Sequence, residues 1–364
     1  MTYTHLSPAH QELRDHTSKV AGSLPAGEPG RINRPLLKAL SEHGLLGRLF
    51  PRTSAMDLCV IREALARHNT EAETAFALQG LGAYPILLAG SESVVDTWMP
   101  LITAGEAAVG FALTEPEAGS DAAALTLAAT PDGDGYRLTG EKVFISNAPD
   151  ADVYSVFART SDNGARGITA FAVPGDAEGL TGTRQQLVSP HPIGRLHFEN
   201  VYVPSASVLG EVDGGWRVAM RTLDMFRPSV GAFALGMGQA ALDAAVAHTS
   251  AREAFRKPLK DFQAVSHQLA DVATRLQAAR LLIHDAAAAY DSGAERTGHL
   301  SAMAKLFATE AAQQAVDVAI QVHGARALEE GHLLEHLYRD VRAPRIYEGA
   351  SEIQREIIAR HLYR

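Results

Sequence analysis

The sequence predicts an α+β protein that is mainly α-helical. We expect an N-terminal helical domain (residues 1–110), a middle antiparallel β domain (111–214) and a C-terminal four-helix bundle (215–364). Three observations support this fold class. Apolar residues recur at helical spacing in the first and last regions, short β-rich runs alternate with turns in the middle, and 364 residues suit about two or three domains.

The N-terminal region contains helical segments separated by helix-breaking residues. Helices are expected over residues 34–42, 57–68 and 91–99. Gly44, Pro51, Pro85 and Pro100 are expected to interrupt the helical pattern. Cys59 falls inside the second helix, where a lone cysteine is expected to pack as a small apolar side chain.

The middle region changes to runs rich in β-branched and aromatic residues. Strands are expected over residues 136–138, 142–145, 153–158, 168–173 and 196–203. Turn dipeptides such as Asp132-Gly133 and Pro174-Gly175 separate these runs. Their spacing predicts a small antiparallel barrel or sandwich.

The C-terminal region returns to long helices. One helix face is expected to carry Val265, Leu269, Val272, Leu276 and Ile283. A second is expected to carry Met303, Phe307, Ala311, Ala315, Val318 and Val322. Further helices are expected over residues 237–248 and 352–361, and four long helices pack most simply as a bundle.

Composition and charge exclude several classes of protein. The chain has 33 Lys and Arg against 42 Asp and Glu, a formal net charge of −9, so no basic domain is available to neutralise a nucleic acid. Residues 1–16 lack the layout of a signal peptide, and no apolar run reaches the ~18 residues that a membrane span needs. A single cysteine excludes an intrachain disulfide. We therefore expect a cytoplasmic protein without nucleic-acid or membrane partners.

Two motif matches have better structural explanations. Residues 236–241 fit the G-x-G-x-x-A dinucleotide fingerprint, but they lie in an Ala-rich helical stretch with no preceding strand. Small residues there would let two helices approach closely. Residues 332–336 fit the zinc-peptidase spacing H-x-x-E-H, but the sequence offers no third ligand. We expect both segments to be structural and no metal to be bound.

Two segments at strand ends carry side chains suited to an acceptor-rich ligand. In residues 111–121, Gly119 permits close approach of the backbone, and Thr114 and Ser120 offer hydroxyl groups. Residues 142–147 end a second strand with an aromatic and a hydroxyl side chain.

Residues 345–354 place a carboxylate beside a helix start. Ser351 with Gln354 fits a capping box and predicts a helix from Glu352. Glu348 then lies on a corner next to a glycine, where the helix dipole favours its charged form and a desolvating ligand would raise its pKa. Such opposed influences suit a general base near neutral pH.

In their order and spacing, these segments resemble the acyl-CoA dehydrogenase family of flavoenzymes. The resemblance covers residues 6–364. It is carried by the segments TEP (114–116), GSD (119–121), FISN (144–147), REAF (252–255), FQAV (262–265), QVHG (321–324) and YEG (347–349). It implies an acyl-CoA dehydrogenase-like fold that holds FAD where the three domains meet.

The resemblance also implies which residues bind FAD. The isoalloxazine end would be held by Phe111, Leu113, Thr114, Gly119, Ser120, Phe144 and Ser146. The adenylate end, shared across a subunit interface, would be held by Arg252, Phe255, Gln263, Gln321, Val322, Gly324 and Ala325, with Ala350 and Glu352 near the ring. A homodimer or homotetramer follows from such sharing.

The same resemblance implies dehydrogenation of an acyl thioester. Glu348 would remove the α proton while hydride passes from the β carbon to flavin N5, and hydrogen bonds to the thioester carbonyl would stabilise the enolate. Substrate contacts would come from Ser120, Asp224, Arg227, Tyr347 and Gly349. Some family members place the base on the helix that holds Asp224, but the matching residue here is Phe226, which accepts no proton. Glu348 is therefore the expected base.

Several positions depart from the family pattern. Arg256 stands where a glycine is usual, Ala325 and Ala327 replace two further glycines, and Ala350 replaces a common flavin-contacting threonine. Residues 185–192 lack the basic, glycine-containing segment often found beside the CoA arm. We expect weaker or rearranged FAD binding.

The shortened chain is similar to members that act on acyl groups tethered to an acyl carrier protein. That subgroup includes enzymes of polyketide extender-unit biosynthesis, of the hydroxymalonyl or methoxymalonyl type. An acidic carrier would need a basic rim, for which Arg184, Arg195 and Arg256 are candidates. The expected partners are CoA or a carrier protein, and an electron acceptor such as an electron-transfer flavoprotein.

Two alternatives remain open from the sequence. One is a flavin oxidase or monooxygenase of the same fold, which would consume oxygen. The other is a flavin-free scaffold that keeps the fold for protein interaction, which the altered positions Arg256, Ala325 and Ala350 would suit.

Overall fold

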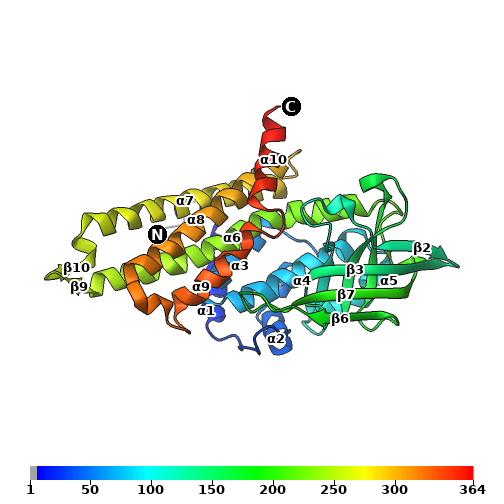
Figure 1. Cartoon of the computed structure of the whole chain (residues 1–364), viewed down its shortest axis with the longest axis horizontal. Helices are drawn as coiled ribbons and strands as arrows, with labels where there is room; N and C mark the ends of the chain where they lie inside the picture. The colour runs from blue at the N-terminus through cyan, green and yellow to red at the C-terminus, as the bar shows by residue number, and fades with distance from the viewer. Residues whose placement is uncertain (1–5, 364) are drawn as a thin grey trace. The chain divides into compact units, whose positions relative to one another are not determined.

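The computed structural model describes residues 6–363, which form N-terminal helices, a middle β-sheet and C-terminal helices in the predicted order (Figure 1). The chain folds into two compact units. Unit 1 comprises residues 1–23, 54–73 and 224–364, and unit 2 comprises residues 24–53 and 74–223. The described residues do not include residues 1–5, for which no signal peptide was expected, or residue 364, the last of the predicted bundle.

The N-terminal helices confirm the predicted segments. They are α1 (Pro8–Ala21), α2 (Arg34–Glu42), α3 (Ala55–His68), α4 (Thr70–Ala89) and α5 (Glu92–Thr103). Helix α3 begins earlier than expected because the Ser54 side chain accepts a hydrogen bond from the Asp57 amide. Pro85 and Pro100 were expected to interrupt helices, but they lie inside α4 and α5. A proline removes only one backbone donor, and the rest of each helix is retained.

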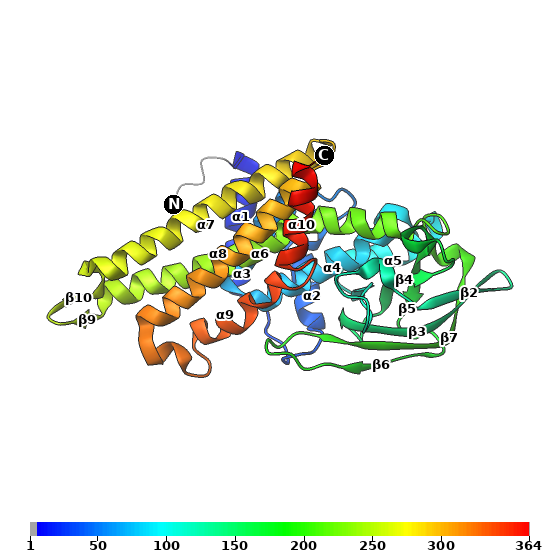
Figure 2. The same cartoon turned by 45° about the horizontal axis from the view of Figure 1, so that its top comes forward.

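Strands β1 to β8 form one eight-stranded sheet, most of whose strands are labelled in Figure 2. They are β1 (Val109–Ala112), β2 (Ala128–Asp132), β3 (Gly135–Ser146), β4 (Val153–Arg159), β5 (Ile168–Pro174), β6 (Leu180–Arg184), β7 (Ile193–Pro204) and β8 (Val208–Leu209). The order is β6-β7-β3-β2-β4-β5-β8, with β1 beside β4. Two expected strands, 136–138 and 142–145, are one continuous strand, β3.

The sheet is mainly antiparallel, with two parallel pairings that the sequence did not indicate. Strand β1 pairs with β4 in parallel, and β2 touches β4 through the single pair Ala128 and Arg159. The long connection through residues 113–152 allows the parallel pairing of β1 with β4. Leu138, Tyr154 and Phe171 lie in the buried core cluster of this sheet.

Unit 1 contains the long C-terminal helices. They are α6 (Gly215–Ala251), whose first residues belong to unit 2, α7 (Gln263–Asp291), α8 (Gly298–His323), α9 (Leu333–Val341) and α10 (Ser351–Leu362). A short hairpin, β9 (Glu253–Ala254) and β10 (Lys257–Pro258), joins α6 to α7. Short 3-10 helices are η1 (Leu46–Arg48), η2 (Ala122–Ala124), η3 (Gly164–Gly167), η4 (Ser205–Ser207), η5 (Leu259–Asp261), η6 (Gly324–Leu328) and η7 (Ala343–Arg345).

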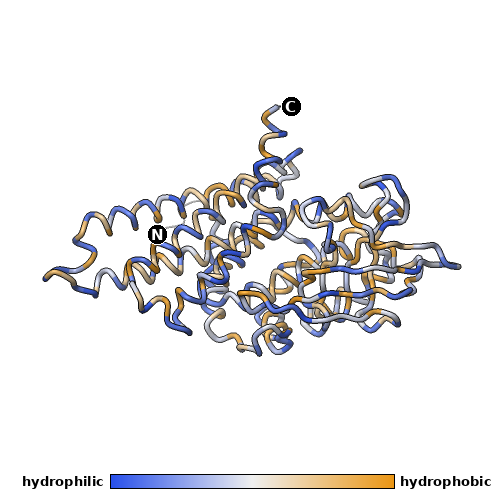
Figure 3. The backbone as a smooth tube through the Cα atoms, in the orientation of Figure 1, coloured by the Kyte–Doolittle hydropathy of each residue, from blue (hydrophilic) through white to orange (hydrophobic). Residues whose placement is uncertain are grey.

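The predicted apolar face of α7 is mostly buried, but the predicted face of α8 is only partly buried. On α7, Leu269, Val272, Leu276 and Ile283 are buried as expected, but Val265 is only half-buried. On α8, Ala311 and Ala315 are buried, but Met303, Phe307, Val318 and Val322 are only half-buried. The buried face of α8 is instead lined mostly by alanines, among them Ala304, Ala308, Ala312 and Ala319. Hydrophobic and hydrophilic residues accordingly alternate along these helices in Figure 3.

Helix α6 is long and apolar enough to cross a membrane by length and composition alone. Its most apolar 18-residue window has a mean hydropathy of 1.4, which corrects the expectation that no such run exists. That window is 78% buried inside the protein, as in the core helix of a globular fold. Cys59 is also buried, as expected.

The glycines of residues 236–241 confirm the close-packing interpretation. A Cβ atom on Gly238 would lie 2.9 Å from Leu276 of α7 and 3.1 Å from Ala312 of α8. A Cβ on Gly236 would lie 2.5 Å from the Glu63 carbonyl oxygen of α3. The segment lies within α6, not at a strand-to-helix turn, so the dinucleotide fingerprint is absent here.

The Gly236→Ala substitution is expected to destabilise the protein by about 1–3 kcal/mol, because the new methyl group meets backbone that cannot give way. Urea unfolding measures the change. Gly22→Ala is the matched control, since a Cβ there meets nothing within 4 Å. Equal stability of the two variants would contradict the close packing of α6 on α3.

Candidate active site

Glu348 occupies a strained corner in unit 1, between η7 and α10. Its φ of 51° lies in the left-handed region, and Gly349 follows with a φ of 92°. A non-glycine residue with such a φ is uncommon and persists only where the surroundings enforce it. The corner is therefore held by contacts outside its own sequence.

Lys305 of α8 supplies those contacts. Its side chain is completely buried, and its Nζ donates hydrogen bonds to the carbonyl oxygens of Tyr347 (2.9 Å) and Gly349 (2.6 Å). Burial lowers the pKa of Lys305 to about 8. The residues on both sides of Glu348 are thus fixed to one ammonium group.

The α10 start differs from the predicted capping box. The helix begins at Ser351, and the N-cap residue is Ala350. The Ser351 hydroxyl donates to Glu310 (2.9 Å), while the Gln354 amide donates to the Gly349 carbonyl oxygen (2.7 Å). The capping box is wrong because both side chains bind elsewhere, and Gln354 instead becomes a second restraint on the Glu348 corner.

The Glu348 carboxylate experiences opposed influences, as predicted, but from different sources. Burial raises its pKa, and the positive charges of Arg62, Lys305 and Arg227 partly offset that rise. The net pKa is above the ordinary carboxyl value. Its Oε2 atom is buried and has no hydrogen-bond partner among the described residues. A buried carboxylate oxygen without a donor is poised to accept a proton.

Arg62 of α3 is the cation with the largest effect on Glu348, and it is itself only 3% exposed. Its Nε donates to Glu73, whose side chain is 1% exposed, and its Nη1 donates to the Ser229 hydroxyl at 2.7 Å. The Ser229 hydroxyl in turn donates to the Phe226 carbonyl oxygen (2.6 Å). Phe226 is buried, consistent with its exclusion as the base.

Asp224 and Arg227, expected near the thioester, form an ion pair. Arg227 Nη1 lies 2.6 Å from Asp224 Oδ1, and Arg227 is 5% exposed. The Arg227 Nε is buried without a partner among the described residues. The structure therefore brings Arg227, Tyr347 and Glu348 together in unit 1 and adds Arg62 and Lys305, which the sequence did not nominate.

In unit 2, a buried ion pair shapes the segment that follows β1. Glu115 accepts hydrogen bonds from Lys142 Nζ (2.8 Å) and the amides of Thr126 (2.6 Å) and Leu127 (2.9 Å). Lys142 Nζ also donates to the Leu113 carbonyl oxygen (2.9 Å). Burial raises the pKa of Glu115, but Lys142 and these hydrogen bonds outweigh it, so the net pKa is lowered.

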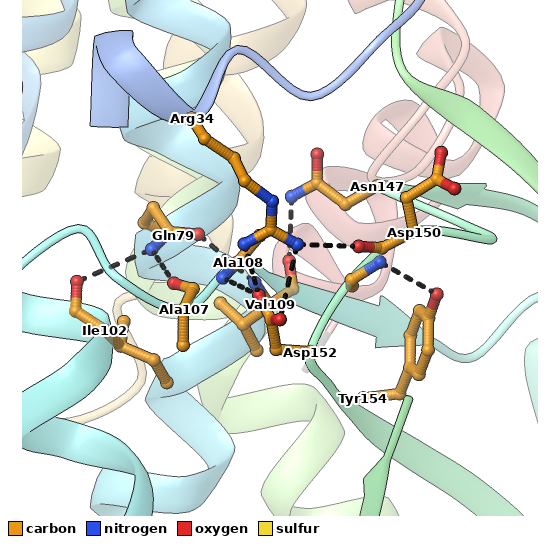
Figure 4. Close-up of polar contacts among 11 residues, drawn as sticks. Arg34, Gln79, Ile102, Ala107, Ala108, Val109, Asn147, Asp150, Asp152 and Tyr154 are labelled. Atoms are coloured by element: carbon orange, nitrogen blue, oxygen red, sulfur yellow. Dashed lines mark hydrogen bonds and ion pairs between the residues drawn. The ribbon is translucent and has the colours of Figure 1, made fainter. Parts of the chain in front are cut away.

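The start of β1 is positioned by side chains that replace missing strand partners (Figure 4). Gln79 of α4 donates to the Ala107 carbonyl oxygen (2.8 Å) and accepts from the Val109 amide (3.2 Å). The Asn147 amide donates to the Val109 carbonyl oxygen (2.9 Å). Asp152 accepts from the Ala108 amide (2.6 Å) and from Arg34, so each backbone group is satisfied.

The strand ends of unit 2 present the predicted flavin-binding side chains to differing degrees. Phe144 is 54% exposed on a φ of 55°, and its amide donates to the Gln185 side chain (3.0 Å). The Ser146 hydroxyl hydrogen-bonds His191 (2.9 Å). Gly119 and Ser120 are exposed, Phe111 and Thr114 are half-buried, and Leu113 is buried.

The adenylate-side residues lie in unit 1 at turns and helix ends, with Gln263 at the start of α7 and Gln321 and Val322 near the end of α8. Phe255 is 90% exposed, with a φ of 52°, and Arg256 follows with a φ of 68°. Gly324 has a φ of 67°, and a Cβ there would meet nothing within 4 Å. The structure describes the remaining predicted members, Arg252, Gln263, Gln321 and Ala325, as exposed, and Val322 as half-buried.

Two groups of residues singled out in the sequence have structural roles. Arg184 and Arg195 were expected to form a basic rim, but they pair with Asp150 and Glu141, each at 2.7 Å. These pairs neutralise the charges that an acidic partner would need. In the H-x-x-E-H segment, the His332 ring accepts from the Leu334 amide and caps α9. Among the described residues, no group of three metal-ligating side chains could hold a metal ion.

Family models place the chain in a known family. The N-terminal, middle and C-terminal domains of acyl-CoA dehydrogenase match residues 7–106, 110–201 and 213–363. The protein belongs to the acyl-CoA dehydrogenase family and is an FAD-dependent oxidoreductase.

Individual relatives and solved structures show the range of this family. Cyclohexane-1-carbonyl-CoA dehydrogenase of Geobacter metallireducens is 35% identical over 97% of this chain and 94% of its own length. Caffeyl-CoA reductase-Etf complex subunit CarC of Acetobacterium woodii is 34% identical, covering 91% of this chain and 90% of its own. Butyryl-CoA dehydrogenase from Megasphaera elsdenii matches with a TM-score of 0.93 at 30% identity over 100% of both chains.

Two further structures have different substrates in their descriptions. PigA, solved with FAD and proline, matches with a TM-score of 0.93 at 25% identity over 100% of this chain and 99% of its own. The prolyl acyl carrier protein oxidase AnaB matches with a TM-score of 0.93 at 26% identity over 98% of this chain and 99% of its own.

The residues present fit FAD. The exposed aromatic Phe144, the open backbone at Gly119 and Gly324, and the exposed Arg252 offer stacking, close approach and positive charge. Aromatic faces, glycine backbone and arginine are what a flavin ring and a pyrophosphate require.

The Lys305→Met substitution is expected to loosen the Glu348 corner, because two backbone carbonyl oxygens lose their buried donor. Amide hydrogen exchange over residues 346–350 should accelerate about tenfold, the factor that corresponds to ~1.4 kcal/mol. Lys257→Met, at an exposed lysine, is the control and should leave exchange there unchanged. Unaltered exchange in Lys305→Met would contradict the restraint.

Proposed function

We propose that the protein dehydrogenates an acyl thioester with Glu348 as the general base. The observation that carries the proposal is the buried, unpartnered Oε2 of Glu348 with a raised pKa, on a corner fixed by Lys305. A base whose pKa is raised toward neutrality both accepts protons effectively and is deprotonated often enough to act.

The chain's own residues perform the proton-transfer half of the reaction, in which the α proton of the substrate is removed. Glu348 takes the α proton of the substrate, and the electron pair left on the α carbon forms the new Cα–Cβ double bond. The Glu348 backbone amide is available to hydrogen-bond the thioester carbonyl, which stabilises the negative charge that develops there. FAD, when bound, accepts the hydrogen and electron pair that leave the β carbon. The positive charges of Arg62, Lys305 and Arg227 favour the ionised form of Glu348, which is the form that accepts the proton.

The residues proposed to hold FAD are those implied by the family resemblance. In unit 2 they are Phe111, Leu113, Thr114, Gly119, Ser120, Phe144 and Ser146; in unit 1 they are Arg252, Phe255, Gln263, Gln321, Val322, Gly324, Ala325, Ala350 and Glu352. We propose that Ser120, Asp224, Arg227, Tyr347 and Gly349 contact the acyl thioester. We further propose a cytoplasmic homodimer or homotetramer with domains at residues 1–110, 111–214 and 215–364.

The carrier of the acyl group and the electron acceptor follow from the relatives. CoA is the carrier in the names of most matched proteins, and an Etf complex is named for CarC. AnaB, an acyl carrier protein oxidase, supports a carrier protein as the alternative and oxygen as the alternative acceptor. Arg184 pairs with Asp150 and Arg195 with Glu141, while Arg256 is exposed; because CoA and a carrier protein are both anionic, these pairs do not separate them. The names of the relatives are the reason for proposing CoA and an electron-transfer flavoprotein.

The Glu348→Gln variant should keep its yellow FAD but lose anaerobic flavin reduction by an acyl thioester at least about 100-fold, because an amide cannot accept the α proton. Stopped-flow bleaching of the flavin measures the rate. Glu356→Gln on α10 is the control, since that side chain is 55% exposed and belongs to no proposed site. Reduction by Glu348→Gln at the wild-type rate would rule out this base.

The rate of flavin reduction should fall as the pH falls through the pKa of Glu348. Because that pKa is raised, the fall is expected at a higher pH than an ordinary carboxyl group of pKa 4.5 would give. Reduction rates measured from pH 5 to 8 test this expectation. A rate that stays constant down to pH 5 would show that Glu348 has no raised pKa.

A further inference from the structure

Three histidine rings gather in unit 1, where the ends of α6 and α8 meet the start of α9. The His248 and His323 rings are stacked, with centroids 4.1 Å apart and planes inclined by 24°. The His332 ring meets the His323 ring edge-on, at 5.7 Å and 68°. All three residues are half-buried, so each ring keeps part of its surface open to a ligand. Two charged imidazolium rings this close would repel each other, so the stack suits uncharged rings.

The surroundings of these rings are positive and lack a counter-charge. Burial lowers the pKa of His248, and the charges of His323, Arg252, Arg326 and His332 lower it further. Within residues 6–363, none of these five side chains forms an ion pair with a carboxylate. The chain as a whole has a formal net charge of −9, so such a group of unpaired basic side chains is unusual in it. An anion at this place would meet only favourable charges.

The hydrogen bonds of two rings show which nitrogen carries the proton. His323 Nδ1 lies 2.7 Å from the Ala319 carbonyl oxygen, which only accepts, so Nδ1 carries the proton of the uncharged ring. His323 Nε2 then has a lone pair and cannot donate to an anion. His332 Nδ1 accepts from the Leu334 amide at 3.1 Å, so its Nε2 carries the proton and is already a donor. His323 must therefore gain a proton before it can bind an anion, whereas His332 need not.

The pKa of His323 agrees with an uncharged ring in the absence of an anion. Burial and the charge of His332 lower that pKa, although the hydrogen bond to the Ala319 carbonyl oxygen acts in the opposite direction. A negative charge beside an imidazole raises its pKa, because it stabilises the protonated form. An anion that binds here thus changes the ionisation of the ring that receives it.

The residues next to these rings indicate which anion they meet. His323 stands between Val322 and Gly324, which are proposed to hold the adenylate end of FAD. Arg252, from the same proposed set, donates from its amide to the His248 carbonyl oxygen at 2.8 Å. The pyrophosphate of FAD stays ionised throughout the neutral pH range, so any proton taken up on binding must go to the protein.

We propose that His248 and His323 form a proton-linked anion site, which gains a proton when the pyrophosphate of FAD binds. Arg252 and Arg326 supply its permanent positive charge, and His332 Nε2 supplies a donor. The proposal rests on the proposed function, which assigns the neighbouring residues to the adenylate end of FAD. Because the loaded state binds more protons than the empty state, the protein holds FAD more tightly as the pH falls.

Calorimetry counts the protons directly. FAD is titrated at pH 7 into the full-length protein freed of FAD, in two phosphate-free buffers that differ in their heat of ionisation. The difference in heat should correspond to uptake of about 0.5–1 proton per FAD, and the dissociation constant of FAD should rise about tenfold between pH 6 and pH 8. No proton uptake and a constant affinity would overturn the proposal.

Two variants assign the proton to the histidines. H248F/H323F keeps two aromatic rings in place but removes both imidazoles, so most of the uptake should disappear. H197F, at an exposed histidine of β7, is the matched control and should retain it. Glu348→Gln should also retain it, which excludes the proposed base as the group that gains the proton. Uptake that persists in H248F/H323F, or that disappears in Glu348→Gln, would overturn the site.

The outcomes separate this site from the proposed reaction. Affinity for FAD that does not change with pH, in a protein whose flavin an acyl thioester still reduces, would overturn the anion site alone. Proton-linked binding of FAD, with no reduction by any acyl thioester, would overturn the reaction alone. If H248F/H323F does not fold, the wild-type protein and Glu348→Gln still decide, because uptake must be present and equal in both.

Discussion

The pKa of the Glu348 carboxylate, set by its burial and by nearby positive charges, determines what the active site can do. Burial raises the pKa of Glu348, and the positive charges of three nearby cations partly offset that rise. Arg62, Lys305 and Arg227 come from three different helices, so the balance exists only when unit 1 is folded. The left-handed corner at Glu348 is maintained by the same set, because Lys305 binds the carbonyl oxygens on both sides of it. One lysine therefore contributes to both the position and the ionisation of the base.

In unit 2, buried polar side chains also bind backbone groups, but there they hold the ends of a strand in place. Lys142 binds Glu115 and the Leu113 carbonyl oxygen, and Gln79 binds the backbone on both sides of the β1 start. In each case, a buried polar side chain satisfies backbone groups that regular secondary structure leaves unpaired. The result is a rigid strand end that presents Phe111 to Ser120.

The sequence predicted local features well and tertiary ones poorly. Helix α2 and most strands follow from short-range patterns of apolar spacing, glycine and proline. The left-handed corner at Glu348 does not, because it is held by Lys305, which is distant in the sequence. The capping box failed because the Ser351 hydroxyl is bound by Glu310, which is distant in the sequence. Arg62 and Glu73 lie eleven residues apart on different helices, and no periodicity links them. Arg62 and Lys305 lie on the buried faces of α3 and α8, but the apolar spacing of α8 indicated a different face, through Met303 and Phe307, and so gave no signal for Lys305.

Proton transfer at Glu348 can be observed without any oxidation of substrate. An acetyl thioester has α hydrogens but no β carbon, so it cannot be dehydrogenated. In D2O, the wild-type holoprotein should incorporate deuterium into the acetyl group of acetyl-pantetheine, as followed by NMR, and Glu348→Gln should reduce that exchange to the background rate. Exchange at equal rates in both proteins would contradict the account, because the proton would then be leaving to some other group.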